Sequence, residues 1–218
     1  MGPDLTALYN KALGHFGQRP ITSPTDGSLQ SAVLNRIWPT SRQSVLSLKD
    51  WSCSTVTAAL VVLDDATFYL PDGWAYGYTY PSMCLAFWKV LNGVAASDYR
   101  YDNDFPGSSL QKNLETGDPY EVGYDATLNA KVIFTNTESA IGRYSHDLAD
   151  TTLYSPSLVD VMALRLAADA APSLVADLTI VDSLVRKYNI QASEAQRLTS
   201  SEYKANQPSG GGLIDSRG

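Results

Sequence analysis

The residues that could carry acid–base or metal chemistry are few in this sequence. His146 and Asp147 stand side by side, as they do in histidine–aspartate metal sites. Such a site needs further His and Asp ligands on neighbouring helices, and His15 is the only other histidine in the chain. We therefore interpret His146-Asp147 as a polar pair at the end of a strand, and we predict neither a catalytic residue nor a metal ion there.

Two acidic pairs are the other candidates for chemistry. Asp64-Asp65 and Asp102 with Asp104 could bind a hard cation or act as a paired acid and base. Neither pair belongs to a twelve-residue calcium loop. Solvated loop carboxylates are the better interpretation of both pairs.

The cysteines and the motif search favour no active site either. Cys53 and Cys84 form no CxxC pair, and two thiols with two histidines cannot complete a closed zinc site without carboxylates. We expect both thiols to be reduced and buried. The chain contains no GxSxG elbow, no phosphate loop and no GxGxxG motif, each of which would mark a particular chemistry. We therefore expect no enzyme and no cofactor.

The charge of the chain argues against nucleic-acid binding. Its 218 residues carry a formal net charge of −7 and only 16 Lys and Arg. Proteins that bind DNA phosphates usually show a basic excess, so a DNA-binding module is disfavoured and repulsion of DNA is expected. The chain has 13 tyrosines, and tyrosine suits interaction surfaces because its ring is apolar while its hydroxyl can still hydrogen-bond to water.

No targeting or membrane segment is predicted. The start, MGPDLTALYNKALGHFG, lacks a basic region followed by an apolar core, so we expect no signal peptide. The longest apolar stretch, Val56 to Leu63, is far shorter than the roughly 20 residues that span a bilayer. We expect a soluble protein made in the cytoplasm.

The elements that must position these residues begin with two helices. Asp4 is the expected N-cap of the first helix, and Gly17 with Pro20 is the expected stop. A second helix should start near Ser28 and bend or break at Pro39. The apolar residues of the first helix form one stripe, namely Leu5, Leu8, Tyr9, Ala12, Leu13 and Phe16.

The middle of the chain has strand periodicity. Tyr76, Tyr78 and Tyr80 alternate with small residues, as strand residues do. Residues 99–119 are rich in Asp, Asn, Gly and Ser and predict a long exposed loop. Further short strands are expected over residues 85–91, 120–123, 131–135 and 141–144.

Helix returns in the last third. Ser155 and Pro156 predict a helix start, and residues 158–171 are apolar nearly all round, which is typical of a helix at the centre of a bundle. Pro172 should interrupt it, and a last helix of about 30 residues should follow, about 45 Å long. Its inward stripe includes Leu178, Val181, Val185, Tyr188, Ala192 and Ala195.

The C-terminal tail has its own prediction. Residues 207–218, QPSGGGLIDSRG, form a flexible lead followed by Leu213, Ile214 and Arg217, the composition of a segment that orders on binding.

Because neither the first nor the last helices can bury their stripes alone, they should pack together. The predicted fold is mainly α with a β insertion, an antiparallel helical bundle with a small β-rich arm and an extended tail. The expected boundaries are 1–50, 51–150, 151–206 and 207–218.

The aromatic cluster of Trp74, Tyr76, Tyr78 and Tyr80 has two interpretations. It is either one face of the core of the insertion, which is somewhat favoured, or a subunit interface, because Tyr and Trp are enriched in interface hot spots.

Several segments follow one another in a recognisable order, namely YNKALGHFGQRPITSPTDGS, IWPTSRQSVLSLKDW leading into SCSTVTAAL, GWAYGYTYPSMCL, and YSPSLVDVMALRLAADAAPSL before a long last helix. This ordered set resembles the head-to-tail adaptor, or tail tubular A, proteins of short-tailed bacteriophages. Together the segments span most of the chain. Residues 99–119 depart from the family's pattern.

The resemblance implies a structural subunit of a twelve-fold ring in the virion neck, assembled in the host cytoplasm. The portal protein lies above such a ring, the tail nozzle and the fibres attach below or around it, and double-stranded DNA passes through its channel without specific binding. The tail residues Leu213, Ile214 and Arg217 are then expected to bind the portal.

An alternative of another class is a hydrolase of glycans or cell walls, which would use aromatic side chains to stack on sugars and a carboxylate pair for catalysis.

Overall fold

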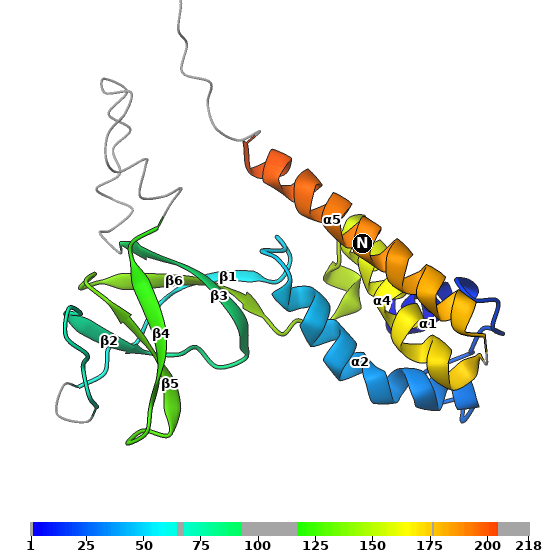
Figure 1. Cartoon of the computed structure of the whole chain (residues 1–218), viewed down its shortest axis with the longest axis horizontal. Helices are drawn as coiled ribbons and strands as arrows, with labels where there is room; N and C mark the ends of the chain where they lie inside the picture. Colours follow the sequence, from blue (N-terminus) through cyan, green and yellow to red (C-terminus); the bar gives the residue numbers. More distant parts are fainter. Residues whose placement is uncertain (1, 65–67, 93–116, 176, 205–218) are drawn as a thin grey trace, which may run out of the picture. The chain divides into compact units, whose positions relative to one another are not determined.

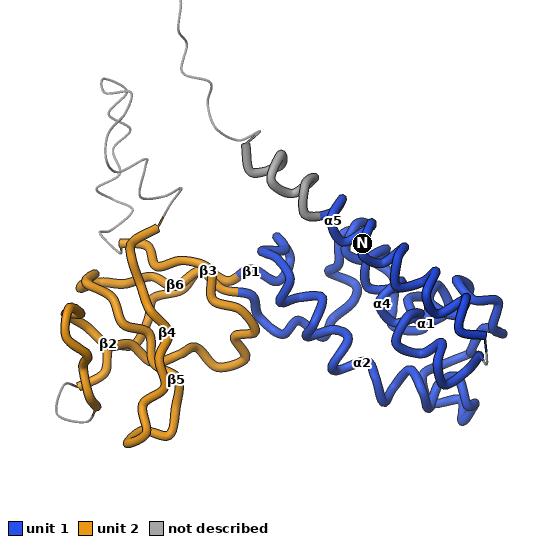
Figure 2. Tube along the Cα trace, in the orientation of Figure 1, with its two compact units in different colours: residues 1–55, 145–205 blue, residues 56–144, 206–218 orange. Residues whose placement is uncertain are grey.

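The computed structural model describes residues 2–64, 68–92, 117–175 and 177–204, with side chains as far as residue 195. The chain divides into two compact units (Figure 2). Unit 1 comprises Met1–Thr55 and Ser145–Ala205, and unit 2 comprises Val56–Tyr144. The predicted tail residues Leu213, Ile214 and Arg217 lie outside the described residues, as do Asp65, Asp102, Asp104 and residues 99–116 of the predicted loop.

Unit 1 is helical (Figure 1). Its elements are α1 (Leu5–Gly14), α2 (Leu29–Ser47), the short 3-10 helix η1 (Thr151–Leu153), α4 (Pro156–Leu174) and α5 (Leu178–Lys204). The predicted N-caps Asp4 and Ser155 are confirmed, and Ser28, near which the second helix was expected to start, is its N-cap. The side chains of all three accept hydrogen bonds from backbone N–H groups three residues ahead. Among the described helices, none is both long and apolar enough to cross a membrane.

Helix α4 lies at the centre of unit 1, as its sequence predicts. It packs against α1, α2 and α5, and Leu158, Met162 and Leu166 are completely buried. Five alanines of α4 are buried as well, which allows the neighbouring helices to come close. These are Ala163, Ala167, Ala168, Ala170 and Ala171.

The two prolines act differently from the sequence-based expectation. Helix α2 continues through Pro39 without a break, and α4 continues through Pro172 to Leu174. Helix α4 ends after Leu174, where Val175 takes an extended conformation. Pro39 and Pro172 are both exposed, so solvent can hydrate the carbonyl groups that lose their helical partners.

Unit 2 consists of two three-stranded sheets. One has the strand order β1-β6-β3 and the other β2-β5-β4, in which β5 pairs antiparallel with both neighbours. The strands are β1 (Thr55–Ala59), β2 (Tyr76–Thr79), β3 (Cys84–Asn92), β4 (Tyr120–Asp125), β5 (Ala130–Thr135) and β6 (Ala140–His146).

Two short bridges join the edges of these sheets. The chain beyond β1 pairs with β2 through the Val62–Tyr78 bridge, and β3 pairs with the residue just before β4 through the Val90–Asp118 bridge. The second bridge has a hydrogen bond of 2.8 Å from the Asp118 N–H to the Val90 carbonyl. The strands therefore follow one another in a closed, barrel-like circuit, β1-β6-β3-β4-β5-β2.

The circuit has an inner and an outer apolar cluster. The inner cluster contains Tyr78, Val90, Ile133 and Ala140, with Phe87 among the rings packed against them. The outer cluster, on the other face of β5, contains Phe68, Val132 and Phe134. The central strand β5 is thus covered on both faces from Val132 to Thr135.

The predicted fold class is wrong. Within the described residues the chain has four α-helices and two antiparallel three-stranded sheets, which is a mixed α and β fold and not a mainly α bundle with a small β arm. The strands expected over residues 85–91, 120–123, 131–135 and 141–144 are present as β3, β4, β5 and β6, and Tyr76–Thr79 forms β2. The strand that was missed is β1, whose continuation to Leu63 is apolar at consecutive positions. Such a run lacks the period-2 signal of a strand.

Candidate functional site

Asp147, half of the strongest metal candidate, is engaged in a structural ion pair. Its carboxylate accepts two hydrogen bonds from the Arg42 guanidinium, at 2.7 and 2.9 Å, and one from the Gln43 amide at 3.0 Å. Burial alone would raise the pKa of Asp147, but these hydrogen bonds outweigh it and hold the pKa below its ordinary value. The pair connects α2 to the chain just after β6, so Asp147 stabilises unit 1.

The histidines do not join it in a metal site. The His146 backbone N–H donates to the Ser54 carbonyl at 2.8 Å. His15 is exposed at the end of α1, where partial burial and the nearby Lys11 and Lys187 lower its pKa. Among the described residues, no group of three or more His, Cys, Asp or Glu could hold a metal ion.

The cysteines are half-buried and lie in different units. Burial raises the pKa of the Cys53 thiol. Burial also raises the pKa of Cys84, although Tyr80 and Lys131 act in the opposite direction. Neither thiol has the lowered pKa that favours a reactive thiolate.

The aromatic cluster is divided between the two faces of sheet β2-β5-β4. Tyr78 is 1% exposed in the inner cluster, and its hydroxyl donates to the Thr137 carbonyl at 2.7 Å. Tyr76 and Tyr80 pack against the same cluster, and the Lys131 ammonium lies 5.1 Å from the Tyr80 ring centre. Trp74 packs on the outer cluster and donates from Nε1 to Glu121 at 3.2 Å. These positions stabilise the β unit.

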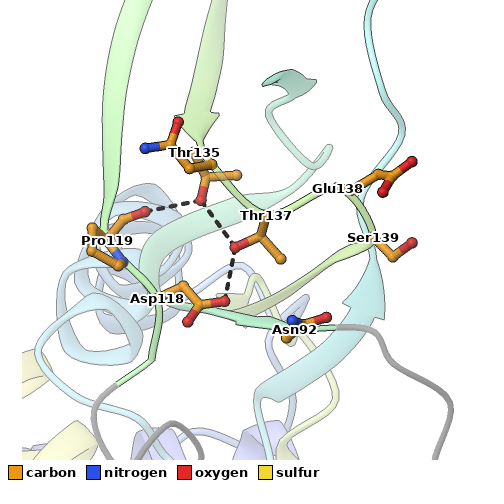
Figure 3. Close-up of a pocket in the computed structure, with 8 residues that line it drawn as sticks. Asn92, Asp118, Pro119, Thr135, Thr137, Glu138 and Ser139 are labelled. Carbon is orange, nitrogen blue, oxygen red and sulfur yellow. Dashed lines mark hydrogen bonds between the residues drawn. The ribbon is translucent and has the colours of Figure 1, made fainter. Parts of the chain in front are cut away.

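A polar cavity of about 420 Å³ lies at the end of β5, where β4 begins (Figure 3). The Thr137 hydroxyl donates to the Asp118 carboxylate at 2.8 Å, and the Thr135 hydroxyl donates to the Pro119 carbonyl at 2.9 Å. Figure 3 shows Asp118 turned toward Thr137, while Glu138 points away from both. The two carboxylates that line this cavity therefore do not converge as an acid–base pair.

A second cavity, of about 430 Å³, lies in unit 1 between the N-terminal segment and α4. Lys11 and Asp160 form an ion pair beside it. Gly2 is held there by a hydrogen bond of 2.7 Å from its N–H to the Thr152 carbonyl, and a Cβ at this position would lie 2.5 Å from the Thr151 carbonyl oxygen. This region fixes the start of the chain to η1 and α4.

The surface that sequence reasoning missed is on α5. The 3–4 spacing of the last helix predicts one inward stripe, but the structure divides it. Leu184, Tyr188 and Ala195 are buried, whereas Leu178 is 77% exposed and Val185 is 42% exposed. We call Leu178, Val185 and the half-buried Ala192 the α5 row, because they are spaced seven residues apart along one side of the helix. The apolar stripe of α5 is wider than one neighbouring helix can cover, and this width was the sequence signal that part of the stripe would be exposed.

A second exposed row lies on α2. Leu29, Ala32 and Arg36 are exposed at positions i, i+3 and i+7, and we call them the α2 row. Leu29 is 66% exposed. Arg36 makes a long hydrogen bond of 3.4 Å to Ser173. Both rows belong to unit 1.

Comparison with protein-family models and with curated proteins gives no match for this chain.

Proposed function

We propose that the chain is a structural subunit of the head-to-tail adaptor of a short-tailed bacteriophage. In this role it forms a ring in the virion neck between the portal protein and the tail nozzle, and double-stranded DNA passes through the ring. The copy number of twelve and the attachment of fibres follow from the resemblance alone.

The observation that supports this proposal best is where the resembling segments fall. Residues 9–28, 37–51 and 154–174 form most of α1, the loop before α2, the second half of α2, and α4. These elements are the framework of unit 1, which leaves apolar side chains exposed on both α2 and α5. A subunit in a closed ring needs two different contact surfaces, one for each neighbour.

The distribution of charge is consistent with DNA passing without being bound. Residues 56–144 contain eleven Asp or Glu and five Lys or Arg, so unit 2 carries most of the net charge of −7. A surface of this sign repels phosphates and offers few contacts for counterion release.

Sizing the purified protein, alone and mixed with the portal protein of the same virus, tests the proposal. We expect a ring, or a complex that forms only with the portal. A monomer that ignores the portal and hydrolyses glycans would overturn the proposal in favour of the hydrolase.

The role of the C-terminal tail can be tested separately. Removal of Gly210 to Gly218, which lie outside the described residues, should leave the melting temperature unchanged and abolish attachment to the portal. A weak contact made by Leu213, Ile214 and Arg217 gains strongly when it is repeated around a ring. A truncated protein that still assembles normal necks would show that the tail does not bind the portal.

A further inference from the structure

Helices α2 and α5 lie on different sides of α4 (Figure 1). Each packs on α4 with one face and leaves its row exposed. The α2 row lies on the side away from the buried residues of α2, whereas the α5 row lies directly beside the buried face of α5. Unit 1 therefore presents two different helical surfaces, the α2 row and the α5 row, that the chain does not cover itself.

The α5 row has the spacing of a helix–helix contact. Leu178, Val185 and Ala192 repeat every seven residues, which is the period at which one helix meets another along its length. The row spans about 21 Å, which is less than the roughly 28 Å of α4. The row is therefore exposed because of the direction in which it faces, and not because α4 ends short of it.

The α2 row has a matching shape and charge. Ala32 is small, so a second helix can approach closely between Leu29 and Arg36. Helix α2 contains no acidic residue, and its other arginine, Arg42, is engaged with Asp147. Arg36 is thus the cation that an approaching helix would meet.

The α5 row carries the complementary charge. Asp182 is exposed between Leu178 and Val185, on the same side of the helix. The basic residues Arg186 and Lys187 lie further round the helix, as the 100° step per residue requires. An exposed acid thus lies beside the apolar residues of the α5 row, and an exposed base lies within the α2 row.

We propose that the α5 row of one copy packs on the α2 row of the next copy, with Asp182 paired to Arg36. The contact is head-to-tail, so each subunit uses its α5 on one side and its α2 on the other, which is the arrangement that closes into rings. This inference rests on the proposed ring function and names the surface through which the ring forms.

Charge reversal in mixed populations tests the pairing. Asp182→Arg alone and Arg36→Asp alone should each weaken assembly by about tenfold or more, because like charges then face each other. A 1:1 mixture of the two variants should assemble again, since alternating copies restore an opposite-charge pair at every contact. The double variant D182R/R36D should assemble by itself. Mass photometry with the full-length chain, with the portal added if the parent needs it, measures each case.

A matched control separates the contact from the change in net charge. Glu194 is exposed on a different side of α5, so Glu194→Arg changes the net charge equally and should leave assembly unchanged. Thermal melting of each variant shows whether it is folded.

The outcomes distinguish the contact from the proposed function. Single variants that assemble like the parent, or folded single variants that do not recover when mixed, would overturn the α5–α2 contact and leave the ring intact. A parent chain that stays monomeric with and without the portal would overturn both. A dimer that Asp182→Arg disrupts but Arg36→Asp does not would show a symmetric α5–α5 contact in place of the proposed one.

Discussion

The two units of this chain bury their cores by different means. In unit 1 the core is one aliphatic helix, α4, surrounded by three others, and its buried alanines let the helices approach closely. In unit 2 the core is built from rings: Phe87 lies 5.1 Å from Tyr120 and 6.4 Å from Tyr144, measured between ring centres. Phe68 and Phe134 stack at 6.4 Å in the outer cluster.

The difference shows what each unit requires of its sequence. Unit 1 needs the centre of α4 to be free of charge. Unit 2 needs space for rings, and glycine provides it. A Cβ at Gly77 would lie 2.3 Å from the Phe68 ring, and one at Gly142 would lie 2.8 Å from the Phe87 ring. Substitutions that add charge should therefore damage unit 1 most, and substitutions that add volume should damage unit 2 most.

The largest effect is expected at the centre of α4. Leu166 is completely buried, so Leu166→Asp would place an unpaired carboxylate among aliphatic side chains and should cost about 4 kcal/mol or more of the free energy of unfolding. Hydrogen exchange should show that residues 156–174 lose protection, while residues 130–135 in unit 2 keep theirs. Leu178→Asp, at the exposed end of α5, is the control and should leave the stability of the monomer nearly unchanged. Equal melting of the Leu166 variant and the parent would contradict the central position of α4.

The next largest effect separates a nearly buried ion pair of unit 1 from a solvated one. The side chains of Arg42 and Asp147 are 13% and 11% exposed, whereas those of Lys11 and Asp160 are 44% and 45% exposed. Asp147→Ala leaves a nearly buried guanidinium without its carboxylate and should cost about 3 kcal/mol. Lys11→Ala breaks a solvated pair and should cost less than about 1 kcal/mol. Urea denaturation of both variants measures the two costs, and similar values would mean that burial does not set the strength of these pairs.

A smaller effect is expected from one methyl group in unit 2. Gly77→Ala must move the Phe68 ring, because its Cβ would lie far inside contact distance, and it should cost about 1–3 kcal/mol. Gly14→Ala is the matched control, since a Cβ on that helical glycine meets nothing within 4 Å and should stabilise the chain by about 0.5–1 kcal/mol. Thermal melting of the two variants should shift in opposite directions. A stabilised Gly77 variant would show that the ring above it is free to move.

The sequence was most informative where one helix face decided burial. Asp4 and Ser155 could be identified as caps, and Ser28 as the approximate start of a helix, because a capping side chain acts within its own turn. The central position of α4 followed from its lack of a polar face. Pro39 and Pro172 were misjudged because a proline on an exposed face costs a helix less than its sequence suggests.

The pairing of the strands into sheets and the exposed rows depend on contacts that no local pattern records. The closed circuit of unit 2 depends on bridges between residues far apart in the chain, such as Val62 with Tyr78 and Val90 with Asp118. The pairing of Asp147 with Arg42 crosses 105 positions, so the dipeptide His146-Asp147 gave no sign of it. The exposure of Leu178 and Val185 depends on how much of the apolar stripe of α5 is covered by α4.

The smallest predicted effect is the response to acid, which compares one carboxylate from each unit. Asp147 in unit 1 and Asp125 in unit 2 both have a lowered pKa. The pKa of Asp125 is lowered by backbone N–H groups of Leu128, Tyr69 and Thr127, which donate to its carboxylate at 2.8, 3.1 and 2.8 Å. The stability that each carboxylate contributes is fully present above the ordinary Asp pKa of about 4, and it is lost as the pH falls through the lower pKa of the folded state.

The melting temperature of the parent should therefore fall steadily below about pH 5. Asp147→Asn removes the charge from the ion pair and should flatten this fall, because the variant no longer has a carboxylate to protonate. Asp125→Asn also removes a carboxylate with a lowered pKa and should flatten the fall as well. Its amide oxygen can still accept the N–H groups of Thr127 and Leu128, so this variant should lose less stability at neutral pH than Asp147→Asn. Melting curves between about pH 2 and pH 7 measure both slopes. Parallel curves for the parent and the Asp147 variant would show that the Arg42 pair does not contribute to the acid sensitivity of unit 1, and a flatter curve for the Asp125 variant would place that sensitivity in unit 2.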